Sequence, residues 1–64
     1  MKMTDDDIAL GAAMMLLRRH GHLAPRRVAE RIGELALAGD REGIRIWKRI
    51  ASRMDEIIQP GAAQ

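Results

Sequence analysis

The side chains that could carry out catalysis or bind a metal are few. Ser52 and Thr4 are the single serine and the single threonine among 64 residues, and the chain has no cysteine and no tyrosine. Covalent catalysis needs an activated nucleophile, so there is little material for it here. His20 and His22 suggest a metal pair, but a lasting site needs three or four ligands, and no acidic residue is near them in sequence. We therefore expect no enzyme, no catalytic residue, no metal and no cofactor.

A second group of side chains is suited to binding a partner. Basic residues recur every three or four positions, a spacing that places them along one face of a helix with few acidic neighbours. Such a face is most simply a solvated surface, but arginine contacts to phosphate would give nucleic-acid binding without sequence preference. An acidic protein partner is the other alternative. The predicted basic face consists of Arg41, Arg45, Lys48, Arg49 and Arg53.

Helices must position these residues, and the first predicted helix has well-marked ends. Thr4 can cap it, and the three aspartates that follow place negative charge where free backbone amides favour it. Asp7, three residues after Thr4, nearly matches a capping box, with Asp in place of Glu. Gly21 suits a left-handed C-terminal cap. These signals predict a helix over residues 5–20.

Two further helices are predicted to form an antiparallel hairpin. Pro25 suits the first position of a helix, because the amide lost there has no intrahelical partner. Gly39 can end that helix and Asp40 can cap the next one, so the two form a tight reversal. Each helix carries its apolar residues on one stripe. The pattern predicts helices over residues 25–38 and 41–58.

The predicted first helix differs from the other two because apolar residues surround it completely. Such a helix needs covering on all sides, and two amphipathic stripes cover only part of it. A domain of this size buries only about 60% of its unfolded surface, and without cysteine it has no disulfide to stabilise it. We therefore expect a two-fold homodimer, the alternative being a monomer with an apolar patch. The predicted self-association face consists of Leu10, Met14, Met15 and Leu17.

Three residues inside the predicted helices call for a packing explanation. Trp47, the single aromatic residue, lies in the middle of the apolar stripe of residues 41–58 and is expected to anchor the core. Gly11 and Gly33 interrupt helix interiors at a cost of about 1 kcal/mol each relative to alanine. We expect a neighbouring helix to approach closely at both glycines.

Short motifs mark the predicted turns and the last helix. They are Arg18-Arg19-His20-Gly21, Ala24-Pro25, Ala29-Glu30-Arg31, Ala38-Gly39-Asp40, Gly43, Trp47, Ile50 and Met54-Asp55. With its His-Gly turn, Ala-Gly-Asp turn and single Trp, the chain resembles, over about residues 5–58, a group of short alphaproteobacterial helical proteins catalogued as a domain of unknown function. The resemblance implies a bacterial cytoplasmic protein and supplies no activity, cofactor or catalytic residue.

Together these patterns predict an all-α, three-helix domain over residues 1–58 and a flexible C-terminal tail over residues 59–64. The expected function is that of a homodimeric protein-interaction module with an unidentified protein partner. The alternative is a nucleic-acid accessory protein that uses the basic face. The lack of cysteine, of a secretory signal and of an apolar run of about 20 residues favours the cytoplasm and no membrane partner.

Overall fold

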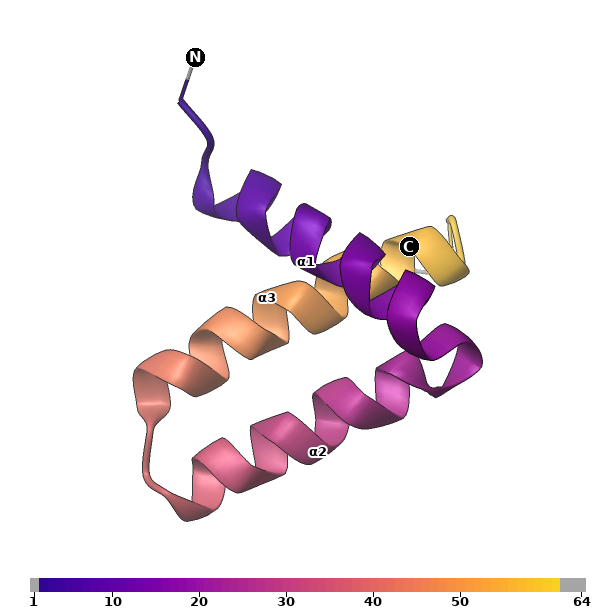
Figure 1. The fold of residues 1–64 in the computed structure, drawn as a ribbon. Helices are drawn as coiled ribbons and strands as arrows, with labels where there is room; N and C mark the ends of the chain where they lie inside the picture. The colour runs from indigo at the N-terminus through magenta and orange to yellow at the C-terminus, as the bar shows by residue number, and fades with distance from the viewer. Residues whose placement is uncertain (1, 62–64) are drawn as a thin grey trace.

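The computed structural model describes residues 2–61, and every regular element in that range is helical (Figure 1). Helical residues run without a break from 5 to 37 and again from 41 to 58. The first stretch contains α1 (Asp5–His20), the 3-10 turn η1 (Gly21–Leu23) and α2 (Ala24–Leu37), and the second stretch is α3 (Arg41–Ile58). The prediction of an all-α protein is confirmed.

The prediction of three separate helices is not confirmed, because the turn expected before Pro25 is itself helical. Gly21 ends α1 with a φ of 58°, the left-handed value that favours glycine. The amide of Ala24 then donates to the carbonyl oxygen of Gly21, which closes a 3-10 turn that passes directly into α2. The first helical stretch is therefore bent at Gly21 and continues, and Pro25 is the second residue of α2.

The start of α1 is fixed by the predicted capping box. The hydroxyl oxygen of Thr4 accepts a hydrogen bond from the amide of Asp7 at 3.1 Å, and the amide of Thr4 donates to Oδ2 of Asp7 at 3.0 Å. The second of these bonds, made by the backbone amide of Thr4, is the main cause that lowers the pKa of Asp7 below its ordinary value of 3.8. The ionised form of Asp7 therefore stabilises the folded state.

The capping box predicts a specific pH dependence. Because the pKa of Asp7 is lower in the folded chain than in the unfolded chain, its contribution is present above the ordinary value of 3.8 and is lost as pH falls through the folded value. An Asp7→Asn variant should be less stable than the parent at neutral pH, and the difference should shrink in acid. Urea titrations followed by circular dichroism at several pH values measure it. A difference that is constant with pH would contradict the role of the charge.

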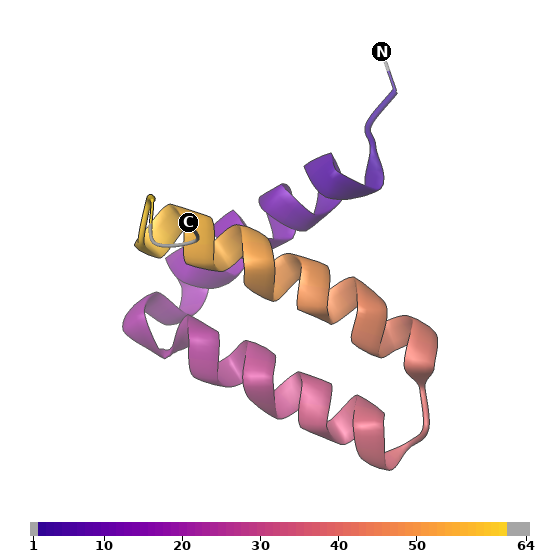
Figure 2. The same cartoon turned by 180° about the vertical axis from the view of Figure 1, so that it is seen from behind.

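The reversal between α2 and α3 also follows from local chemistry. Gly39 has a φ of 72°, and Oδ1 of Asp40 accepts a hydrogen bond from the amide of Gly43 at 2.9 Å. The two helices then run side by side in opposite directions (Figures 1 and 2). The antiparallel hairpin forms as predicted. Of the predicted tail, residues 59–61 form a turn after α3, and residues 62–64 lie outside the described range.

The core lies where α3 packs against both α1 and α2. Trp47 is half-buried and packs against this core, as its position in the apolar stripe predicts. Three of the six clustered residues are alanines, so the buried side-chain volume is small. The buried cluster consists of Ala9, Ala13, Ala24, Val28, Ile50 and Met54.

The close approach expected at two glycines is wrong. A β-carbon built on Gly11 or on Gly33 would have no neighbouring atom within 4 Å, so both face open space. The crowded glycine is Gly43, where a β-carbon would lie 2.7 Å from Oδ2 of Asp40 and 3.0 Å from Cδ2 of Leu35. The capping carboxylate of Asp40 therefore folds back over Gly43, and a side chain at this position would have to displace it.

These surroundings predict opposite responses to alanine. Gly33→Ala should raise the free energy of unfolding by about 1 kcal/mol, because it improves helix propensity and meets no neighbour. Gly43→Ala should leave the free energy of unfolding unchanged. Displacing the Asp40 cap costs about 1 kcal/mol, which offsets the improvement in helix propensity that alanine brings. Urea unfolding at one protein concentration tests both. Equal stabilisation by the two variants would contradict the close contact at Gly43.

Candidate interaction surface

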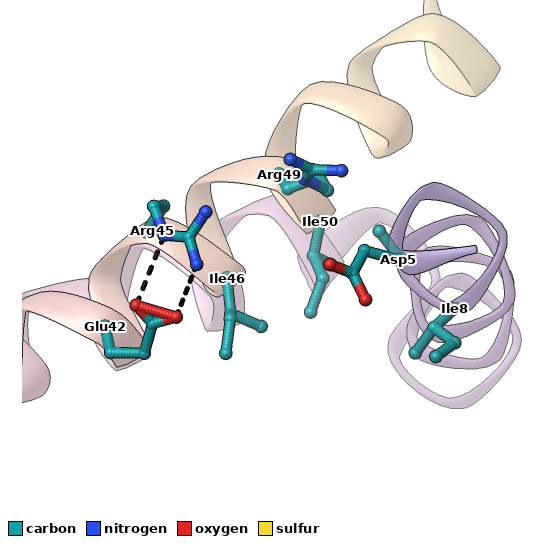
Figure 3. Close-up of a pocket in the computed structure, with 8 residues that line it drawn as sticks. Asp5, Ile8, Glu42, Arg45, Ile46, Arg49 and Ile50 are labelled. Carbon is teal, nitrogen blue, oxygen red and sulfur yellow. Dashed lines mark hydrogen bonds and ion pairs between the residues drawn. The ribbon is translucent and has the colours of Figure 1, made fainter.

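A cleft with a volume of about 350 Å³ lies between α1 and α3 (Figure 3). Ile46 and Ile50 are four residues apart on α3, so they share one face, and Ile8 projects toward the opening from α1. Ile50 is buried, whereas Ile8 and Ile46 are 56% and 51% exposed. The cleft thus has an apolar centre that nothing in the described chain covers. Its lining consists of Asp5, Ile8, Ala9, Glu42, Arg45, Ile46, Arg49 and Ile50.

The two sides of the cleft carry opposite charge. Asp5 is the charged residue on the α1 side. On the α3 side, Arg45 and Arg49 outnumber the single acid, Glu42. Nε of Arg45 donates to Oε2 of Glu42 at 3.3 Å, and this bond lowers the pKa of Glu42 and raises the pKa of Arg45. Because that pair is neutral overall, the α3 side has a net charge of +1 from Arg49, and the α1 side has −1 from Asp5.

The structure breaks up the predicted basic face. Arg45 pairs with Glu42 three residues earlier, and Nη1 of Arg53 lies 3.2 Å from Oε1 of Glu56 three residues later. Nε of Arg53 also lies 3.7 Å from Oδ1 of Asp6 and so links α3 to α1. The expectation of few acidic neighbours is therefore wrong for two of the five residues. Arg41, Lys48 and Arg49 are exposed and make no ion pair within residues 2–61.

The four residues of the predicted self-association face do not share one exposed surface. Leu17 packs against the buried core, and Leu10 is half-buried. Met14 and Met15 are each 48% exposed, but successive helical residues point about 100° apart. Helix α1 does expose apolar side chains, as its composition predicts. The exposed ones are Ile8, Met14 and Met15 rather than the predicted four.

The histidines lie at the corner between α1 and η1. His20 is half-buried and His22 is exposed. Within residues 2–61, no three histidine, cysteine, aspartate or glutamate side chains are grouped closely enough to hold a metal ion. In the same residues, no helix is both long and apolar enough to cross a membrane.

The fold and this surface define a small all-α protein with an apolar cleft edged by opposite charges. The chain belongs to a family of unknown function, DUF6961, which matches residues 6–60. No curated protein and no solved structure matches the chain. The matched range contains every lining residue of the cleft except Asp5.

Sequence reasoning missed the cleft because Ile8 and Ile46 are 38 positions apart, and only the crossing of α1 over α3 brings them together. One local signal was available. Glu42 with Arg45 and Arg53 with Glu56 stand at a spacing of three, at which opposite charges meet on a helix. Applying that rule along the predicted third helix identifies both pairs.

Proposed function

We propose that this protein is a small interaction module that acts as a homodimer. The observation that supports this most directly is the exposure of its large apolar side chains.

The exposed surface is rich in large apolar side chains. Among residues 2–61, these side chains outnumber the seven residues of the buried core, of which three are alanines. Two of the exposed side chains, Ile8 and Ile46, come together in the cleft between α1 and α3; apolar side chains gathered on a surface mark interaction sites. A role in binding rather than catalysis agrees with this surface, and the lack of cysteine is typical of a cytoplasmic protein. The exposed residues are Met3, Ile8, Met14, Met15, Leu23, Leu37, Ile46, Ile57 and Ile58.

The molar mass in solution tests the proposal. Light scattering coupled to size-exclusion chromatography should give twice the chain mass of 7.2 kDa at low and at high salt, because an apolar interface is not screened by ions. The fraction of dimer should fall on dilution as mass action requires. A mass of one chain at every concentration would contradict the proposal.

Nucleic-acid binding is the second candidate, and Arg41, Lys48 and Arg49, which have no ion-pair partner in the described part of the chain, favour it. Reversing Arg45 and Arg49 to glutamate should then abolish binding to labelled duplex and single-stranded DNA at low salt, measured by fluorescence anisotropy. Binding that is unchanged in this variant would contradict the candidate. The ion pairs of Arg45 and Arg53 reduce the charge available to phosphate, so the homodimer has the stronger support.

A further inference from the structure

We propose that the cleft between α1 and α3 is the two-fold interface of the homodimer, and that the same cleft of a second copy occupies it. This inference rests on the proposed function and names the surface that performs it. Ile8 and Ile46 form the exposed centre, while Ala9 and Ile50, both buried, form the floor between them. The second copy would cover both exposed isoleucines with its own.

The charges on the two sides of the cleft make the surface complementary to itself. A two-fold axis parallel to the cleft places the α1 side of one copy over the α3 side of the other. Asp5 of each copy then faces Arg49 of its partner, and the contact occurs twice because the interface is isologous. An axis across the cleft would set acid over acid. The charge pattern therefore selects one arrangement of two copies.

The position of the cleft agrees with this occupant. The cleft joins α1 to α3, the two helices whose contact builds much of the core. A partner bound there would hold these helices together, which is how self-association stabilises a small domain.

A charge exchange between two chains tests the pairing across the interface. In the full chain, Asp5→Arg alone leaves two arginines facing each other across the axis, and Arg49→Asp alone leaves two aspartates. Each single variant should therefore dimerise about tenfold more weakly than the parent, or worse. Mixed together, the two variants should form a heterodimer in which both contacts are restored. Lys48→Asp, an exposed change of the same charge outside the cleft, is the control and should keep the parent's dimer affinity.

The outcomes separate the two proposals. Light scattering gives the mass of each variant and of the mixture, and circular dichroism confirms that each one folds. Recovery of the dimer in the mixture, at a concentration at which each variant alone is largely monomeric, supports the inference. Single variants that dimerise like the parent, or a mixture that stays monomeric, would overturn it while a dimeric parent keeps the proposed function. A monomeric parent would overturn both.

A second pair of variants tests the apolar centre. Ile46→Asp places a charge in the cleft, whereas Met14→Asp places the same charge on an α1 residue of similar exposure that does not line it. The first should abolish the dimer at concentrations where the parent is dimeric, and the second should not. If Met14→Asp dissociates the dimer and Ile46→Asp leaves it intact, the interface lies on the surface of α1 that carries Met14, outside the cleft, and the inference is wrong.

Discussion

Replacing Met54 with alanine should lower the free energy of unfolding by about 3 kcal/mol, within the range of 2 to 5 kcal/mol typical of buried methionine. Met54 is 1% exposed and is the largest fully buried side chain within residues 2–61. It belongs to the cluster in which α3 packs against both α1 and α2. Truncation therefore removes transfer free energy and also leaves a cavity that neighbouring alanines are too small to fill.

This loss is large relative to the total stability expected for a chain of this length. At about 0.05 to 0.15 kcal/mol per residue, a chain of 64 residues has a total stability of only about 3 to 10 kcal/mol. The Met54→Ala variant should therefore be largely unfolded at moderate temperature, with low helical signal and early thermal melting in circular dichroism. Because the proposed homodimer would add to the apparent stability, all chains must be compared at one concentration.

Met15→Ala is the matched control for this effect, because it is the same substitution inside a helix at a side chain that is 48% exposed. It should change the stability by about 0.5 kcal/mol or less. If the two variants lose similar stability, burial does not set the cost, and the packing of α3 between α1 and α2 is not the main source of stability.

The predicted bounds match α1 and α3, whereas the helix predicted over residues 25–38 runs over Ala24–Leu37 in the structure. Thr4 and Asp40 accept hydrogen bonds from the amides that follow, and Gly39 adopts a left-handed φ, as their types and positions predict. Such signals act within four residues, so a sequence reveals them directly. The corner at Gly21 was harder to predict, because a left-handed glycine can end a helix or, as here, lead through a 3-10 turn into another.

The parts that sequence could not supply depend on how the helices cross. The apolar composition of α1 predicts exposed side chains, but which of them pack inward depends on how the helices cross. The crossing packs the partly buried Leu17 against the core and leaves Ile8 uncovered. The expectation for Gly11 and Gly33 failed for the same reason, since only the position of neighbouring helices shows that both face open space. The cleft is likewise a tertiary feature that no run of residues encodes.

Ala13→Leu should lower the free energy of unfolding by about 1 to 3 kcal/mol, because it overpacks the core. This variant tests what sets the crossing of α1 over α3. Ala13 is completely buried and lies four residues from Ala9, so the two present a small face to the core. The distance between helix axes depends on the side chains at their contact. A leucine at this position should push α1 away from α3 and weaken the contact between Asp6 and Arg53. Leucine has nearly the helix propensity of alanine, so the loss would come from packing.

The same change should disturb the cleft, because its two sides belong to the two helices that are pushed apart. Ala29→Leu, on an exposed position of α2, is the control and should leave both stability and mass nearly unchanged. Urea titration followed by Trp47 fluorescence measures stability, and light scattering under native conditions measures the dimer. Where Ala13→Leu still folds, it should dimerise more weakly than the parent, since Ile8 and Ile46 no longer present one surface. If this variant is as stable as the parent and dimerises as strongly, then the small side chains of Ala9 and Ala13 do not set the distance between the two sides of the cleft.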